Sequence, residues 1–244
     1  MQVTIISKSE EPIKTLYTAA RTCYSSSTPE KIFKNILNDA ECLKLIKKCI
    51  KSGHHSILEH VNITFAIEGI SRACSHQLVR HRHCSFSQQS QRYVEIKENE
   101  ANLKEAFENR HKFKNFKDST IFKIMNKYFV DVDEYLNLKA YYSALEFYLN
   151  AIKLGKKAEE ARIFLPNATK TNIVLTCNLR ELIHICNERL CANAQKEIKE
   201  LVRQMSFEVS LIMPFLEEFL QPKCEKNGYC SEFKSCGRKK ELKK

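Results

Sequence analysis

Three short segments with the pattern of β-strands, set far apart among long helical stretches, constrain the fold of this chain most. Residues 2–7 (QVTIIS), 61–69 (VNITFAIEG) and 171–177 (TNIVLTC) alternate in polarity or are rich in β-branched side chains. Most of the remaining chain places apolar side chains at helical spacing. No internal repeat or linker divides the chain, so the pattern predicts one α+β domain.

The helical stretches carry recognisable start and stop signals. Pro12 stands near the first turn of one helix, Gly53 ends the next, Ser71 can cap a helix through Arg82, and Pro214 perturbs the last one. The predicted helices cover residues 10–24, 31–53, 71–82, 120–155 with a break near 130–133, 156–166, 178–190 and 193–220. Residues 95–117 are polar and are predicted to be a loop or an exposed helix.

The charge and hydropathy of the chain exclude several classes of protein. The net charge is +11 over 244 residues, but residues 223–244 hold eight Lys or Arg and only three Asp or Glu. We therefore predict a domain over residues 1–222 with a basic, cysteine-containing tail over 223–244, and no nucleic-acid partner. No long apolar run or signal-peptide pattern is present, so we expect no membrane partner, a cytoplasmic location and eleven mostly reduced cysteines.

The segment RHRHCSFSQQSQRY (80–93) is the strongest candidate for a functional site. Cationic or titratable side chains at a helix end are followed by serines, glutamines and a further arginine. Cations alone would only complement the helix dipole. A loop this dense in hydroxyl, amide and guanidinium groups can also bind a phosphate, a ribose and a base edge together. The composition thus predicts an anion site.

This segment, Arg-His-Arg followed by seven residues and Ser, resembles the signature of the flavin-dependent thymidylate synthases. Three further blocks resemble that family in the same order: GHHSILEHVNITFAI, EEARIFLP and CNLRELIHICNERLCANAQKEI. The resemblance implies the family's α+β fold, with a mixed sheet and several long helices, assembled as a homotetramer whose active sites lie between subunits.

The resemblance also implies the ligands and the residues that hold them. FAD would contact Ser56, Arg80, His81, Arg82, Gln88, Asn178, Leu179, Arg180 and His184. The substrate dUMP would contact Gln77, Leu78, Val79, Arg80, Gln88, Gln89, Ser90, Gln91, Arg92, Arg162 and Arg189. Arginine suits phosphate because its planar fork binds two oxygens and keeps its charge. None of the five glycines builds a Gly-x-Gly-x-x-Gly loop, so side chains must hold the flavin.

The implied reaction is the reductive methylation of dUMP to dTMP. Methylenetetrahydrofolate would give the carbon and NADPH would reduce FAD, which carries the difficult chemistry. Arg189 would be the catalytic residue, polarising the uracil so that C5 becomes nucleophilic. Without the family, a surface pair with Glu188 would be the simpler interpretation of Arg189. We expect Ser90 to orient the nucleotide without forming a covalent adduct, because no His–Asp pair is evident to activate it.

Several features remain open at this level. Asn193 stands where many relatives have His, which leaves the role of that position uncertain. His55, Glu59 and His60 match no metal motif, and we assign no metal to the catalytic site. Cys224, Cys230 and Cys236 could bind zinc with one more donor, or be free thiols of a disordered tail. Two rival functions remain: a nucleic-acid-binding protein, and a flavin enzyme without methyl transfer. The colour of the purified protein tests the first rival, because a flavoenzyme is yellow and a nucleic-acid-binding protein is colourless.

Overall fold

The computed structural model describes residues 1–36, 38–133 and 137–240. The chain divides into two compact units. Unit 1 comprises Met1–Ile67, Leu78–Phe86 and Val174–Lys244, and unit 2 comprises Glu68–Gln77 and Ser87–Ile173. Each unit is described by itself below.

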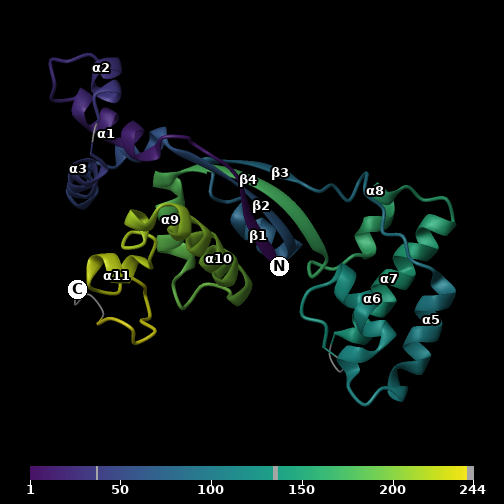
Figure 1. The fold of residues 1–244 in the computed structure, drawn as a ribbon. Helices are drawn as coiled ribbons and strands as arrows, with labels where there is room; N and C mark the ends of the chain where they lie inside the picture. The colour runs from purple at the N-terminus through teal and green to yellow at the C-terminus, as the bar shows by residue number, and fades with distance from the viewer. Residues whose placement is uncertain (37, 134–136, 241–244) are drawn as a thin grey trace. The chain divides into compact units, whose positions relative to one another are not determined.

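The elements follow one another along the chain as Figure 1 shows. The strands are β1 (Gln2–Lys8), β2 (Asn62–Ser71), β3 (Cys84–Gln88) and β4 (Lys170–Asn178). The α-helices are α1 (Pro12–Thr22), α2 (Pro29–Lys34), α3 (Asp39–Lys51), α4 (Arg72–Leu78), α5 (Glu100–Glu108), α6 (Thr120–Tyr128), α7 (Leu138–Lys153), α8 (Ala158–Ala161), α9 (Leu179–Arg189), α10 (Lys196–Ile212) and α11 (Lys223–Asn227). Short 3₁₀ helices are η1 (His55–His60), η2 (Asn109–Lys112), η3 (Phe116–Asp118), η4 (Arg162–Phe164) and η5 (Pro214–Leu216). No helix among the described residues is long and apolar enough to cross a membrane.

The four strands form one sheet in the order β1-β2-β4-β3, and the sheet is antiparallel rather than mixed as the sequence analysis expected. The side chains of Thr64 and Thr176 are hydrogen-bonded at 2.9 Å, and Gly69 N donates to Asn172 Oδ1 at 3.0 Å. The residue numbers of paired positions therefore increase along β2 and decrease along β4, as they do between antiparallel strands. The α+β class is confirmed.

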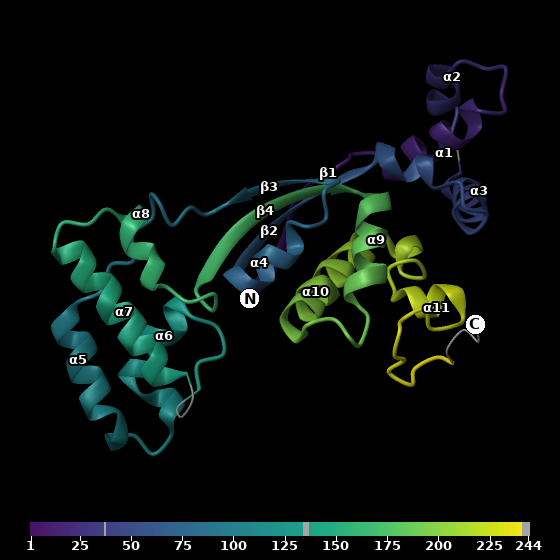
Figure 2. The ribbon, with the colours of Figure 1, turned by 180° about the vertical axis from the view of Figure 1, so that it is seen from behind.

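Unit 1 is built on alternating strands and on two long helices. Ile63, Phe65 and Ile67 of β2 are buried while their neighbours are more exposed, because successive side chains of a strand point to opposite faces. Helix α10 packs against α9 and β1, and the three views show α9 and α10 close together (Figure 2). Near Pro214 the helix ends and a 3₁₀ turn follows, as the sequence indicated.

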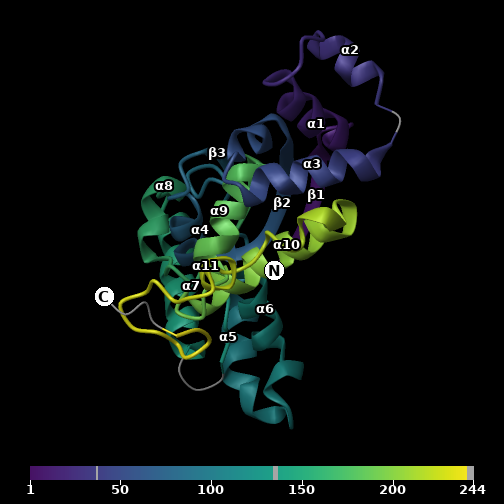
Figure 3. The same cartoon turned by 90° about the vertical axis from the view of Figure 1, so that its left-hand side faces the viewer.

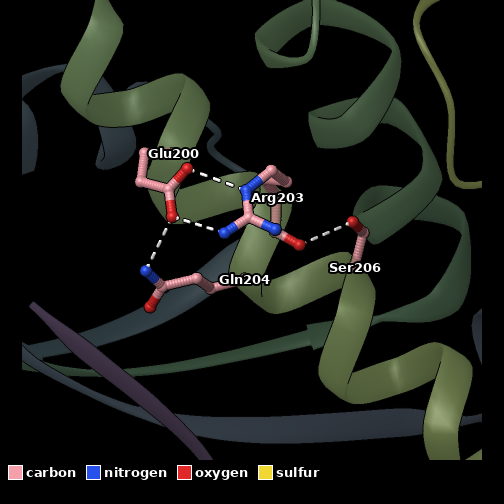
Figure 4. A network of polar contacts seen from close by, with 4 residues as sticks. All are labelled: Glu200, Arg203, Gln204 and Ser206. Atoms are coloured by element: carbon pink, nitrogen blue, oxygen red, sulfur yellow. Dashed lines mark hydrogen bonds and ion pairs between the residues drawn. The ribbon is translucent and has the colours of Figure 1, made fainter.

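The outer face of α10 carries a small polar network around Glu200. Arg203 donates two hydrogen bonds to the carboxylate of Glu200, at 2.8 and 2.7 Å, and Gln204 donates one at 2.9 Å (Figure 4). Ser206 Oγ donates to the carbonyl of Arg203. The Arg203 side chain is 62% exposed, so this pair is a surface feature without a cavity around it.

The N-terminal helices α1, α2 and α3 pack together (Figure 3). The single helix predicted over residues 31–53 is wrong, because two helices occupy this range. Asn35 ends α2, and Asn38 starts α3 by accepting a hydrogen bond from Ala40 N. A short polar side chain that bonds the backbone locally favours a helix end over a helix interior. Residue 37 lies outside the described part of the chain.

Unit 2 has its own hydrophobic core between α5, α6 and α7. Ile121, Met125, Leu145 and Tyr148 are among its buried residues. Helix α5 buries Leu103 and Ala106 in this core, so the polar region expected over residues 95–117 is partly a packed helix. Of the expected break near 130–133, the described residues show that α6 ends at Tyr128 and α7 begins at Leu138.

The signature segment adopts a different structure from the one the sequence suggested. Ser71 caps α4 as expected, with its Oγ accepting a hydrogen bond from Cys74 N, but the helix ends at Leu78 rather than at Arg82. The Ser/Gln run predicted as a loop begins with strand β3, which pairs with β4. Gln89 N donates to Asn172 O and extends this pairing by one residue. Tertiary pairing at the sheet edge overrides the low strand propensity of serine and glutamine.

Candidate active site

His81 and Arg189 form a hydrogen-bonded pair in unit 1. Arg189 Nε, at the end of α9, donates to His81 Nε2 at 3.0 Å. His81 Nδ1 lies 3.6 Å from a carboxylate oxygen of Glu181, and its ring meets that of His184 edge-on, with 5.7 Å between centroids. Because Nε2 accepts a hydrogen bond, the proton of the neutral ring resides on Nδ1 and faces Glu181. The structure thus joins two residues that the sequence analysis assigned to different ligands.

The electrostatics of this cluster keep His81 neutral. Burial, followed by the charges of Arg189 and His184, lowers the pKa of His81 to about 4. His81 is 6% exposed and Glu181 is 7% exposed, so water screens this cluster little. A neutral imidazole can accept the hydrogen bond from Arg189 Nε, whereas an imidazolium, which has no free acceptor nitrogen, could not. Arg189 therefore has a fixed orientation at neutral pH.

Arg189 retains donors for a ligand. Its Nε is used by His81, and no described residue accepts a hydrogen bond from its two terminal nitrogens. The guanidinium is partly exposed. A cation held on one side and open on the other is suited to stabilise negative charge on a bound molecule. The alternative interpretation, a surface pair with Glu188, has no support among the described contacts.

A cavity of about 620 Å³ lies beside this cluster in unit 1. Asn178, Arg180 and His184, three of the residues assigned to FAD, line it from the start of α9. Asn178 caps the helix by accepting a hydrogen bond from Glu181 N, and Arg180 and His184 share one helix face, as their spacing predicted.

The lining of this cavity fits an anionic, nucleotide-like group. His55 and Lys226 line it as well; burial lowers the pKa of His55, and Lys226 lowers it further, which reports a positive potential there. Arg180 is paired with Glu59, whose carboxylate can also accept hydrogen bonds from ribose hydroxyls. Asn187, another lining residue, has a buried Oδ1 without a hydrogen-bond partner among the described residues. A bound molecule with an N–H or O–H donor would satisfy it.

The other residues assigned to ligands in unit 1 differ in what they can offer. Leu78 and Leu179 are fully buried, backbone included, so neither residue exposes surface to a ligand in this structure. Arg80 and Arg82 are exposed and make no ion pair with any described residue, which leaves both cations available for phosphate. Ser56 is exposed on η1, and Val79 is exposed in the turn after α4.

Gln88 and Gln89 are held by hydrogen bonds inside unit 2. Gln88 Nε2 donates to Ser75 Oγ at 2.9 Å and to Thr171 Oγ1 at 3.2 Å. Arg72 Nη1 donates to Gln89 O at 3.2 Å and to Thr171 Oγ1 at 3.4 Å. These bonds tie α4, β3 and β4 together at their polar ends. The same unit contains Gln77, near the end of α4.

Arg92 and Arg162 converge on one residue of unit 2. Arg92 makes an ion pair with Glu159 at 3.0 Å, and Arg162 Nε donates to the backbone oxygen of Glu159 at 3.2 Å. Burial lowers the pKa of Arg72, and the charge of nearby Arg162 adds to this effect, so three arginines share one region. A dianionic phosphate would relieve this concentration of positive charge.

A second cavity, of about 290 Å³, opens beside these residues in unit 2. Gln89, Ser90 and Gln91 line one side, and Tyr148 lies on another. Ser90 Oγ accepts a hydrogen bond from Arg92 N, which shapes the turn that follows β3. No histidine lines this cavity among the described residues, so nothing there would activate Ser90 as a nucleophile.

Two residues of this region were not assigned a role in a ligand site from the sequence. These residues are Glu181, in the first turn of α9, and Arg72, at the start of α4. In the structure Glu181 faces His81, and Arg72 supports Gln89. In the sequence, each of these ionisable residues stands next to apolar residues of its helix. This pattern predicts that the side chain has a buried partner, but it does not identify the partner.

His81, Glu181 and His184 are the only residues of the described chain whose potential metal-ligand atoms gather, three or more, within 4.8 Å. Arg189 already occupies His81 Nε2 and places a positive charge beside the group. A second cation is disfavoured at that position. Hydrogen bonding within the chain accounts for the arrangement.

Comparison with known proteins agrees with this architecture. The family model described as thymidylate synthase complementing protein matches residues 4–215. The flavin-dependent thymidylate synthase of Pyrococcus furiosus is 37% identical over 95% of this chain and 90% of its own length. That of Clostridium tetani is 36% identical over 100% of this chain and 96% of its own length. A crystal structure of the Helicobacter pylori flavin-dependent thymidylate synthase, complexed with FAD and dUMP, is similar with a TM-score of 0.69 at 25% identity, covering 91% of this chain and all of that one.

The fold and these matches define a class of enzyme, the thymidylate-forming flavoenzymes, in which FAD is the cofactor. The chain belongs to the flavin-dependent thymidylate synthase family, and its function is the synthesis of dTMP. The family resemblance of the Arg-His-Arg segment is thereby confirmed.

Proposed function

We propose that this enzyme methylates dUMP reductively, with methylenetetrahydrofolate as carbon donor and NADPH as the source of electrons. The observation that carries the catalytic part is the hydrogen bond from Arg189 Nε to the neutral ring of His81. It fixes a guanidinium whose terminal nitrogens have no acceptor among the described residues. Such a group stabilises negative charge on uracil, which makes C5 the nucleophilic carbon. In this scheme His81 positions Arg189, and Arg189 is the catalytic residue.

The flavin site includes the cavity beside α9. Asn178, Arg180 and His184 would hold FAD there, joined by other members of the assigned set: Ser56, Arg80, His81, Arg82 and Gln88. Bound there, FAD would supply the redox chemistry of the reaction. The residues of the chain bind and orient the reactants. The positive lining of the cavity supports this assignment because FAD carries a pyrophosphate.

The nucleotide site includes the polar residues from the end of β3 onward. Gln88–Arg92 and Arg162, together with Gln77, Val79, Arg80 and Arg189, would contact dUMP. The concentration of Arg72, Arg92 and Arg162 in one region supports a phosphate there. Ser90 orients the nucleotide by hydrogen bonding, and no covalent adduct forms on it.

We further propose that the enzyme is a cytoplasmic homotetramer with active sites shared between subunits. Apolar side chains are exposed where assembly would cover them, such as Phe147 and Phe164, whose stacked rings are 5.8 Å apart and which are 57% and 42% exposed. Residues 1–222 would form the catalytic domain and residues 223–244 an appended basic segment, which the extent of the family match supports. Light scattering on the purified protein tests the assembly, and a monomer that turns over dUMP would contradict it.

The experiment for the function uses colour and product together. The purified protein, supplied with FAD, is expected to be yellow, to be bleached by NADPH faster when dUMP is present, and to form dTMP only when methylenetetrahydrofolate is added. A protein that takes up no FAD would contradict the flavin assignment. A yellow protein that oxidises NADPH but makes no dTMP would indicate a flavin enzyme without methyl transfer.

A further inference from the structure

The segment from Lys223 to Lys240 has an ordered fold without a hydrophobic core of its own. Cys230 is the one buried residue among these described positions, and Phe233 is fully exposed. The segment is fastened by polar contacts, including a 3.0 Å ion pair between Glu225 and Lys239. Exposed ion pairs of this kind contribute little to stability. Short segments that bury so little apolar surface usually depend on a disulfide or a metal ion.

Four thiols line one small cavity under this segment. Cys224, Cys230 and Cys236 come from the segment itself, and Cys191 comes from the turn after α9. Asn193 Nδ2, in the same turn, donates to the backbone oxygen of Lys234 at 3.2 Å and holds the two parts together. The sequence spacing had indicated three thiols and one missing donor; the fold supplies Cys191 as the fourth.

The size of the cavity selects the class of ligand. Its volume is about 20 Å³, which is the space of one water-sized sphere. An organic cofactor does not fit in such a space, whereas a single ion does. All four cysteines are free thiols in the structure, so no disulfide already links the segment.

The charges around the cavity are matched to a thiolate site. A zinc ion with four thiolates carries a net charge of about −2. Cationic side chains that would offset this charge line the same cavity: Lys223, Arg238 and Lys239.

We propose that Cys191, Cys224, Cys230 and Cys236 bind one structural zinc ion that fastens the C-terminal segment to α9. Binding breaks four S–H bonds, forms four Zn–S bonds and releases four protons, with no change of oxidation state. No three of the four sulfurs lie within 4.8 Å of one another in this structure, so binding of the ion would have to bring them closer together. Gly228, between Cys224 and Cys230, and Gly237, directly after Cys236, form left-handed turns with φ of 77° and 87° that other residues rarely adopt.

The test is a metal analysis of the whole enzyme, purified under reducing conditions from zinc-supplemented medium and passed over a chelating resin. We expect about one zinc per chain. Replacing the zinc with Co²⁺ should give the visible absorption of a tetrahedral site together with thiolate-to-cobalt charge transfer. Flavin absorption and FAD content are recorded on the same samples, so failure of this site is distinguishable from failure of the cofactor site.

Variants identify the ligands. Cys191→Ser and Cys236→Ser should each lose the zinc and the cobalt charge-transfer band and should make the C-terminal segment sensitive to proteases. Cys23→Ser, at an exposed thiol after α1, is the matched control and should retain the metal. A wild-type protein without zinc, an iron ion in its place, a disulfide among the four cysteines, or a Cys191→Ser variant that keeps its zinc would each overturn the proposal.

Discussion

The cluster around His81 and the polar segment Gln88–Arg92 come from one stretch of sequence but differ in burial and in partners. His81 is 6% exposed, neutral and bonded to Arg189, whereas Arg92 is exposed and pairs with Glu159. In the first region His81 and Glu181 are buried, and the hydrogen bond to His81 orients Arg189. In the second, hydroxyl, amide and guanidinium groups border an open cavity. The difference teaches that one signature can supply both a preorganised catalytic group and an adaptable binding surface.

The largest effect is expected when the preorganised guanidinium is changed. Arg189→Lys keeps the charge but loses Nε as a donor to His81 and the planar fork, so kcat should fall by about 10²–10³-fold, the usual loss for one electrostatic stabiliser. Steady-state dTMP formation measures it. Arg203→Lys, on the exposed face of α10, is the matched control and should keep wild-type kcat. An Arg189→Lys enzyme within a few-fold of wild type would remove Arg189 from the chemistry.

The neutral state of His81 predicts how stability depends on pH. The folded pKa is about 4, while the ordinary value is 6.5, so between these pH values the unfolded chain binds more protons than the folded one. Protonation therefore favours unfolding, and stability is lost as the pH falls from 6.5 to about 4. The loss from this group is roughly 3 kcal/mol. Chemical denaturation across that pH range measures it.

His81→Gln separates this titration from others, because glutamine offers an acceptor for Arg189 but does not titrate in this range. The variant should lose that part of the pH dependence, while His111→Gln, at an exposed position of η2, should retain it. An unchanged slope in His81→Gln would show that other groups govern the acid limit.

A smaller effect is expected in the adaptable region. Arg92→Ala should raise the KM for dUMP by about 10- to 100-fold, the cost of one charged hydrogen bond, with kcat less affected. Ser90→Ala should be milder still, and mass spectrometry of quenched wild-type enzyme should find no nucleotide attached to Ser90. A Ser90 adduct, absent from Ser90→Ala, would refute the orienting role. A fall in kcat without a change in KM for Arg92→Ala would place Arg92 with the catalytic group instead.

The smallest effect is expected on the exposed face of α10. Hydrogen bonds from Arg203, and then from Gln204, lower the pKa of Glu200 to about 2, yet its side chain is 42% exposed. Glu200→Gln should therefore change the free energy of unfolding by no more than about 0.5 kcal/mol, because solvent screens exposed pairs. If Glu200→Gln lowered the free energy of unfolding by as much as the His81 titration is predicted to, burial would not explain the difference between the two sites.

The sequence predicted the helices with clear caps and the central strands with alternating burial. Ser71 caps α4 as predicted, and Asn178 caps α9 in the same way, because capping is a local property. The partner of Arg189 could not be predicted, because His81 lies more than a hundred residues away and only the fold brings them together. Strand β3 was missed for the same reason, since its serines and glutamines pair with β4 rather than follow their own propensity.

In the proposed mechanism Arg189 activates C5 of the nucleotide. The release of tritium from dUMP labelled at C5 tests this role most directly. With NADPH and methylenetetrahydrofolate present, the wild-type enzyme should release tritium in step with dTMP. Arg189→Lys should lower the rate of release at saturating dUMP by about 10²-fold or more while still binding dUMP and FAD. Release at the wild-type rate from Arg189→Lys would contradict the assignment of uracil activation to this residue.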